Sequence, residues 1–120
     1  MSYRPYTSRT VSVNLTATTT GVGADLVYKV PDRHEAEITF MGLSNGTNSN
    51  KKVSVQIKDN GSYLYLLKEK AVTGNTLLTP LQGDRIFLKA GDEIRAYREA
   101  GDFDFFVSLS VKQFYRGITS

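Results

Sequence analysis

His34 is the residue whose type and neighbours most suggest chemistry. It is the only histidine in the sequence, and it begins the segment His34-Glu35-Ala36-Glu37-Ile38. A zinc-protease helix needs a second histidine four residues after the first, so that both imidazoles face one ion. That position holds Ile38, and the surrounding alternation of residues is typical of a strand. We therefore interpret His34 as an exposed residue at the start of a strand and predict no metal site.

Paired carboxylates are the second candidate for chemistry. Glu35 and Glu37 share one face of a strand, because side chains in strands alternate with period two. Such pairs can hydrolyse glycosides or bind calcium. The sequence lacks the spaced ligands of a calcium loop, and Gly91-Asp92 is typical of a tight turn in which aspartate caps the local backbone. We therefore expect the acidic residues to serve turns and surfaces.

Two further catalytic patterns begin in the sequence and then fail. Residues 21–26 start as Gly-Val-Gly, but the sixth position is Leu26, where a dinucleotide-binding loop has a glycine that begins a helix. Serine residues are numerous, yet a nucleophile needs an adjacent base, and the single histidine would have to serve all of them. We therefore predict no catalytic residue and no cofactor, and we expect that the protein is not an enzyme.

Size and composition indicate a single domain. The 120 residues include no cysteine, and the formal net charge is +3. A core of this size needs neither disulfides nor thiolate-bound zinc. No segment approaches the roughly 20 apolar residues of a membrane-spanning helix, and the first residues lack the apolar core of a signal peptide. We therefore expect assembly in the cytoplasm and no membrane partner.

Local positive charge gathers in the middle of the chain, at Lys51, Lys52, Lys58, Lys68 and Lys70. A nucleic-acid surface would continue this charge as a basic stripe with aromatic residues on the same face. The sequence shows no such stripe. Lysine also protects the edge strands of sheets against aggregation. We favour that interpretation and predict no nucleic-acid partner.

Alternation of apolar and polar residues with period two dominates from residue 9 onward, and it predicts strands. The last strand shows it most clearly, with Phe105, Val107, Leu109 and Val111 on one face. No segment has convincing helical periodicity. The roughly eight expected strands fall at residues 11–15, 26–30, 35–43, 52–59, 62–67, 85–89, 93–98 and 105–111, with a short strand or extended segment at 76–79.

The pair Asn60-Gly61 is the strongest turn signal in the chain, because a type I′ hairpin turn needs positive φ at both central residues. It predicts a hairpin between residues 52–59 and 62–67. Evenly spaced short strands without helices indicate a sandwich or a barrel. The chain lacks tryptophan and a cysteine pair, which disfavours an immunoglobulin domain. We therefore predict an all-β fold, an antiparallel jelly-roll-like β-sandwich that forms one domain over residues 11–120.

Both ends of the chain are basic and rich in aromatic and hydroxyl side chains. Residues 1–10 and 111–120 each carry two positive charges and no acid. Tyrosine and arginine are enriched among the energetic anchors of protein interfaces, and basic ends suit an acidic neighbouring protein. Residues 1–10 are therefore predicted to form an extended N-terminal arm. The residues that we expect to contact a partner are Tyr3, Arg4, Tyr6, Arg9, Phe114, Tyr115 and Arg116.

A series of short motifs runs through about residues 26–112 of the sequence. They are Val30-Pro31, Glu37-Ile38-Thr39, Leu43-Ser44-Asn45, Val53-Ser54-Val55, Tyr65-Leu66-Leu67, Leu88-Lys89-Ala90-Gly91-Asp92-Glu93-Ile94 and Val107-Ser108-Leu109-Ser110. In order and spacing this series resembles small β-sandwich virion proteins of tailed bacteriophages. The resemblance implies a structural role, as a capsid decoration or cement protein, and it carries over no catalytic residue. It also implies the major capsid protein or other virion subunits as partners, and location in the virion.

Two alternatives remain open beside the decoration protein. The same resemblance allows a neck or tail component of the particle. A carbohydrate-binding module would use Tyr63, Tyr65 or Tyr97 as a platform for a sugar. We also expect a homo-oligomer and favour a trimer, with the N-terminal arm laid across neighbouring capsid subunits.

Overall fold

The computed structural model describes residues 5–116, and within them nearly all regular structure is strand. This confirms the all-β prediction. The elements in chain order are β1 (Thr7–Asn14), the 3-10 turn η1 (Gly21–Gly23), β2 (Asp25–Lys29), β3 (His34–Asn45), β4 (Lys51–Asp59), β5 (Ser62–Val72), β6 (Leu77–Leu78), β7 (Ile86–Lys89), β8 (Glu93–Arg98) and β9 (Phe105–Tyr115). Residues 5–116 hold no helix with the length and hydropathy that a membrane crossing requires.

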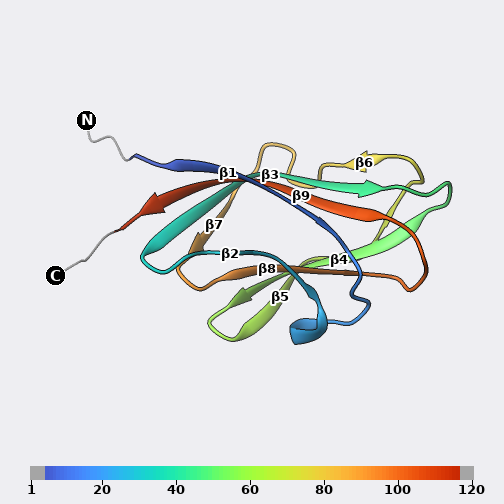
Figure 1. Ribbon diagram of the computed structural model, residues 1–120, viewed down its shortest axis with the longest axis horizontal. Coiled ribbons are helices and arrows are strands. Elements are labelled where there is room, and N and C mark those ends of the chain that lie inside the picture. The colour runs from blue at the N-terminus through green and yellow to red at the C-terminus, as the bar shows by residue number, and fades with distance from the viewer. Residues whose placement is uncertain (1–4, 117–120) are drawn as a thin grey trace.

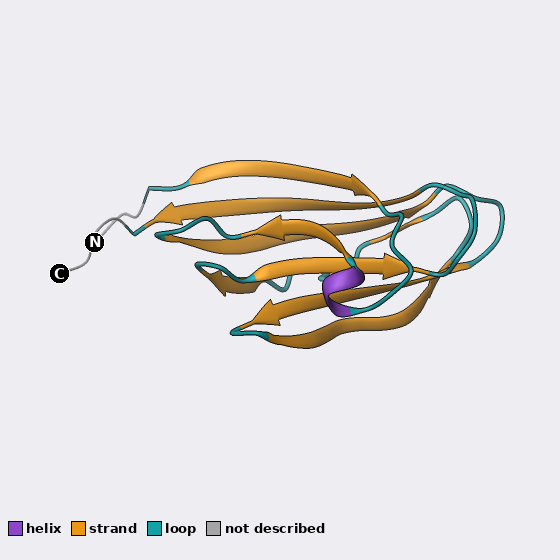
Figure 2. Ribbon diagram, turned by 60° about the horizontal axis from the view of Figure 1, so that its bottom comes forward, coloured by secondary structure: helices purple, strands orange, loops and turns teal. Residues whose placement is uncertain are grey.

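The strands form two antiparallel sheets that pack face to face (Figures 1 and 2). The first, which we call the β1 sheet, has the order β1-β9-β3-β6, and β7 also pairs with β3. The second, the β2 sheet, has the order β2-β8-β4-β5. The strand pairs are therefore nested one inside the next, as in a single long hairpin that has been folded over, and successive pairs alternate between the two sheets. From the outermost pair inward they are β1 with β9, β2 with β8, β3 with β6 and β7, and β4 with β5. This is jelly-roll connectivity, as the sequence predicted.

The core lies between the sheets, and β9 shows how the sequence encodes it. Phe105, Val107, Leu109 and Val111 are all buried, as their alternation predicted. The β2 sheet contributes apolar residues such as Val55 to the same cluster. Burying such side chains away from water is the main stabilising contribution to a sandwich of this kind.

The predicted hairpin between β4 and β5 is confirmed. Asn60 has φ of 50° and Gly61 has φ of 85°, so both central residues of the turn have the positive φ that a type I′ turn needs. Asp59 pairs directly with Ser62 on either side of this turn. Strand β5 continues to Val72, beyond the predicted range 62–67, because β4 offers it main-chain partners as far as Lys51.

The first strand begins earlier than the sequence predicted. Residues 7–10 were assigned to an extended arm, but they form the first half of β1 and pair with β9 from Thr7, opposite Gln113, onward. The reason is that β9 extends to Tyr115, well past the apolar alternation that ends near Val111. Its main chain therefore gives residues 7–10 a ladder partner that lies far away in sequence.

The buried face of β2 also differs from the prediction. The alternation of Leu26, Tyr28 and Val30 predicts one inward face, yet Leu26 is 45% exposed while Val27 and Tyr28 are both buried. The pairing with β8 shifts between Leu26 and Tyr28, which marks a bulge. A bulge inserts one extra residue and so reverses which side chains face the core beyond it.

Arg98 ties together the loops at one rim of the sandwich, and it is 7% exposed. Its Nε donates a hydrogen bond to the Leu15 carbonyl at 2.8 Å. Its Nη1 donates to the carbonyls of Glu99 at 2.9 Å and Gly101 at 3.0 Å. The guanidinium also lies 4.0 Å from the centre of the Phe103 ring. This single buried cation thus satisfies three main-chain acceptors of segments that lack ladder partners.

Candidate protein interface

The described ends of the chain meet at one end of the sandwich, because β1 and β9 are antiparallel neighbours (Figure 1). Tyr6, just before β1, packs against Phe114 near the end of β9 with ring centres 5.7 Å apart. The Lys112 ammonium lies 4.8 Å from the centre of the Tyr6 ring. The structure therefore brings together Tyr6 and Phe114, two of the residues that the sequence singled out for contact with a partner.

These two aromatic residues lie on the outside of the β1 sheet, where further large apolar side chains are also exposed. Along each strand, alternate side chains point away from the core, and several that do so here are large and apolar. Phe87 on β7 is the most exposed, at 75%. Exposed apolar patches of this kind mark interaction sites. The members of this surface, which we call the outer aromatic face, are Tyr6, Phe40, Leu77, Phe87, Phe106 and Phe114.

Gly42 allows two side chains of this surface, those of Phe40 and Leu77, to pack over the backbone of β3. It lies on β3 between the outward-facing residues Phe40 and Ser44. A Cβ atom placed on Gly42 would lie 3.1 Å from side-chain atoms of both Phe40 and Leu77. The absence of a side chain at position 42 thus lets the phenylalanine and the leucine cover the backbone from two strands.

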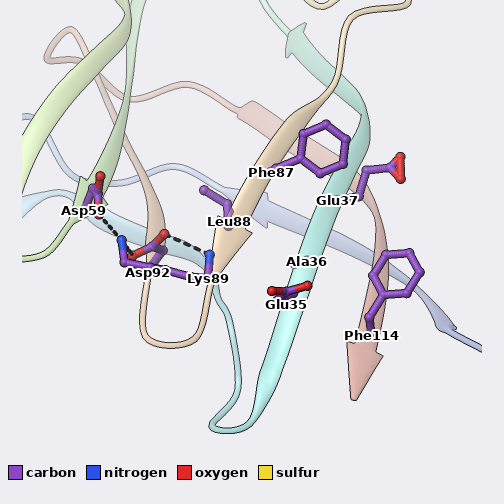
Figure 3. A pocket seen from close by; sticks show the side chains of 9 residues that line it. All are labelled: Glu35, Ala36, Glu37, Asp59, Phe87, Leu88, Lys89, Asp92 and Phe114. Atoms are coloured by element: carbon purple, nitrogen blue, oxygen red, sulfur yellow. Dashed lines mark hydrogen bonds and ion pairs between the residues drawn. The ribbon is translucent and has the colours of Figure 1, made fainter. Parts of the chain in front are cut away.

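An open groove of about 490 Å³ borders the outer aromatic face (Figure 3). Phe87 and Phe114 lie on either side of β3, because Phe87 pairs with Glu37 and Phe114 pairs with Glu35. The view in Figure 3 shows the two aromatic rings flanking Glu37. The residues that line the groove are Glu35, Ala36, Glu37, Asp59, Phe87, Leu88, Lys89, Asp92 and Phe114.

The acidic residues of the groove form ion pairs with neighbouring cations. Glu37 accepts a hydrogen bond from Nη1 of Arg85 at 2.9 Å, and Glu35 pairs with Arg116. Glu35 and Glu37 therefore share one face of the strand, as predicted, and their carboxylates pair with arginines that flank β7 and β9. Within residues 5–116, no three histidine, aspartate or glutamate side chains are grouped so that they could hold a metal ion.

Lys89 bridges the two sheets at the other wall of the groove. Its Nζ binds Asp92 at 3.2 Å and also binds Asp59 at the end of β4. These hydrogen bonds raise the pKa of Lys89, and the bond to Asp59 has the larger effect. Asp92 also accepts a hydrogen bond from the Lys89 backbone N–H at 3.0 Å, which is the turn role that the sequence predicted for it.

The remaining candidate contact residues separate into different environments. Tyr115 lies beside His34, with ring centres 5.2 Å apart, and the backbone N–H of Arg116 donates to the Arg33 carbonyl at 2.6 Å. His34 begins β3, as predicted, and its Nδ1 lies 2.9 Å from the Asp32 carbonyl oxygen. Tyr3 and Arg4 lie outside the described residues.

Arg9 does not belong to the outer aromatic face. It pairs with the buried Val111, so its side chain lies on the inner side of the sheet, opposite to the outer aromatic face. There it lies near Tyr28, whose hydroxyl donates a hydrogen bond to Oε1 of Gln113 at 2.6 Å. Burial raises the pKa of Tyr28 to about 12, and the positive charge of Arg9 opposes this rise. Arg9 therefore belongs with the sandwich rim beside Tyr28.

The tyrosines that could stack on a sugar lie on the β2 sheet. The hydroxyls of Tyr65 and Tyr97 are 2.7 Å apart, and the Lys68 ammonium lies 5.2 Å from the centre of the Tyr65 ring. Hydrogen bonding of the Tyr65 hydroxyl with Thr20, and then with Tyr97, lowers the pKa of Tyr65. Burial raises the pKa of Tyr97. Lys58 lies 5.7 Å from the ring centre of Tyr63. Carbohydrate binding therefore stays a prediction, on rings that lysines partly cover.

A comparison of the sequence with protein-family models and with curated proteins finds no match.

The sequence prediction missed four members of the outer aromatic face, namely Phe40, Leu77, Phe87 and Phe106. A signal for Phe106 was present, because it falls between the buried Phe105 and Val107 and so must point outward. An aromatic residue out of phase with the core alternation is a usable sign of a surface contact. Phe87 and Leu77 lie in short strands whose phase the sequence did not define.

Proposed function

We propose that this protein is a structural component of a tailed-bacteriophage virion, and that it decorates and cements the capsid by binding the major capsid protein. The observation that supports this most is the outer aromatic face, where Phe87, Phe114 and Tyr6 border a charged groove at one end of a jelly roll. The order of motifs in the sequence, which resembles such virion proteins, supports the same conclusion.

The chemistry of the outer aromatic face suits attachment to another protein. Rigid aromatic side chains bury a large area at a small cost in conformational entropy, and they dominate interface energetics. The exposed ion pairs around the groove, such as Lys89 with Asp59, supply a polar rim beside the apolar side chains. Many copies that each bind modestly would stabilise a shell through their combined contacts.

A neck or tail position in the same particle is the alternative role. The outer aromatic face and the groove would serve a ring of subunits equally well. The surface therefore does not separate the two roles, but the number of copies in each particle does. A decoration protein covers the whole shell, whereas a neck or tail protein forms one closed ring.

Removal of residues 1–6 tests whether the N-terminal segment attaches the protein to the particle. Strand β1 begins at Thr7, so we expect this deletion to leave the sandwich folded, with a thermal unfolding midpoint within a few degrees of wild type. We expect the same deletion to abolish incorporation into virus particles, because it removes Tyr3, Arg4 and Tyr6. Incorporation is measured by quantifying the protein in purified particles after complementation.

A matched control separates the length of the segment from its chemistry. A full-length variant with serine in place of Tyr3, Arg4 and Tyr6 should be excluded from particles as strongly as the deletion. A deletion of Met1 and Ser2 alone should be incorporated like wild type. Normal incorporation of the six-residue deletion would rule out attachment through this segment.

A further inference from the structure

Among the described residues 5–116, strand β1 is the most open edge of the sandwich. It pairs with β9 on one side, in an unbroken register from Thr7 to Asn14. The other edges are obstructed: β2 and β5 carry bulges, β6 and β7 are only two and four residues long, and β5 includes the charged run 68–70. Short length, bulges and charge are the usual protections against edge-to-edge pairing. Strand β1 lacks all of them except Arg9.

The main chain of β1 has hydrogen-bonding groups directed away from β9. The Leu15 N–H donates to the Phe105 carbonyl at 2.8 Å, which makes Leu15 and Phe105 a hydrogen-bonded pair. Such pairs alternate with non-hydrogen-bonded pairs along an antiparallel ladder. The N–H and C=O groups of Ser8, Thr10, Ser12 and Asn14 therefore point toward the open edge.

The side chains of β1 leave this edge accessible and give it apolar contact area. Thr7–Thr10, Ser12 and Asn14 are exposed, and Arg9 is the only charged residue of the strand. Val11 and Val13 face inward but are only partly buried at the rim of the core. A strand placed beside β1 would therefore gain main-chain hydrogen bonds and cover two half-exposed valines.

We infer that β1 pairs antiparallel with β1 of a second copy of this chain, so that two β1 sheets join across a two-fold axis. Residues whose main-chain groups point toward the open edge must lie opposite residues of the same kind in the second copy. This requirement restricts the pairing to a few registers. The register that centres on Val11 places Thr10 opposite Ser12 and Ser8 opposite Asn14 of the second copy. It provides about eight main-chain hydrogen bonds, because each hydrogen-bonded pair exchanges two.

Electrostatics favours this register over its neighbour. With Val11 at the centre, each Arg9 lies opposite Val13 of the second copy, and the two arginines are about 14 Å apart along the strands. A register centred on Thr10 brings the arginines to about half that distance, and it leaves one hydrogen-bonded pair fewer within β1. The Val11-centred pairing is self-complementary, as a two-fold interface requires.

The pairing also places both outer aromatic faces on the same side of the joined sheet, because the two-fold axis is perpendicular to it. The dimer would thus present a doubled contact surface to a partner. A two-fold dimer of this kind differs from the trimer that the sequence favours. The inference rests on β1 alone and stands whether or not the partner is a capsid.

Two measurements test the pairing. Light scattering coupled to gel filtration should give a molar mass twice the 13.3 kDa of the chain at high concentration. Thr10→Pro removes an outward N–H at an edge position, where proline is tolerated, so this variant should stay folded and become monomeric. A wild-type protein that is monomeric at every concentration would overturn the inference, and so would a dimer that Thr10→Pro leaves intact.

Disulfide trapping tests the register and does not depend on the proline variant. The chain has no cysteine, so a single introduced thiol reports on one position. Directly opposite residues in a non-hydrogen-bonded pair have Cα atoms about 4.5 Å apart, within disulfide range. Val11→Cys should therefore form a covalent dimer under mild oxidation, whereas the control Val13→Cys should not. Equal cross-linking of both variants, or none of Val11→Cys, would contradict the pairing.

Discussion

Replacing Arg98 with methionine should lower the free energy of unfolding by about 3 kcal/mol, because it removes a buried cation that donates to three carbonyls. The guanidinium satisfies Leu15, Glu99 and Gly101, and it also stacks on Phe103. Methionine fills a similar volume but donates no hydrogen bond. The stabilities are compared by urea unfolding monitored by far-ultraviolet circular dichroism, with the slope of the transition checked for two-state behaviour.

Arg116→Met is the matched control for this substitution. The Arg116 side chain is 50% exposed, and the side chain of its ion-pair partner Glu35 is 29% exposed. Exposed ion pairs contribute at most about 1 kcal/mol, so this variant should lie within that range of wild type. Equal losses for the two variants would show that Arg98 does not organise the rim in the way its hydrogen bonds indicate.

Replacing Phe87 with serine should weaken attachment to the particle by about 30-fold or more, which is the effect of removing one aromatic anchor from an interface. Phe87 is 75% exposed on the outer aromatic face, so the isolated domain gains little stability from it. We expect the free energy of unfolding to change by less than about 0.5 kcal/mol. Attachment is measured by titrating the purified variant onto particles that lack the protein.

Val22→Ser provides the matched control for attachment. Val22 is 80% exposed and belongs to η1. Its carbonyl contacts Arg95 on the β2 sheet, so it lies away from the outer aromatic face. This substitution removes an equally exposed apolar side chain and should leave attachment at the wild-type level. Normal attachment by Phe87→Ser, or an equal loss with Val22→Ser, would rule out the outer aromatic face as the contact surface.

Much of the fold follows from local patterns. The alternation of Phe105, Val107, Leu109 and Val111 correctly identified both a strand and its buried face. The turn at Asn60-Gly61 correctly placed the hairpin, because its two positive φ values are a local steric requirement. Features of this kind are encoded within a few residues, so composition and spacing are sufficient to predict them.

Other parts of the fold depend on partners that are distant in sequence. The start of β1 at Thr7 depends on the length of β9, whose last residues carry no apolar alternation. The bulge between Leu26 and Tyr28 depends on how β2 meets β8, and it reverses the predicted burial of Leu26. Neither feature has a local signature, because each arises from strand pairing.

The candidate interface was predicted only in part. Tyr6 and Phe114 could be selected because both ends of the chain are aromatic and basic, and antiparallel pairing of β1 with β9 then brings them together. Phe87 could not be selected, because it becomes a neighbour of Phe114 only when β3 lies between β7 and β9. A surface built across several strands requires the sheet order, which local patterns do not specify.

The copy number of the protein in purified virus particles tests the proposed role most directly. Quantitative mass spectrometry, calibrated against the major capsid protein, gives the number of copies per particle. A capsid decoration protein that repeats over the shell should be present in hundreds of copies. A single ring of about a dozen copies would place the protein in the neck or tail, and absence from the particle would contradict the account altogether.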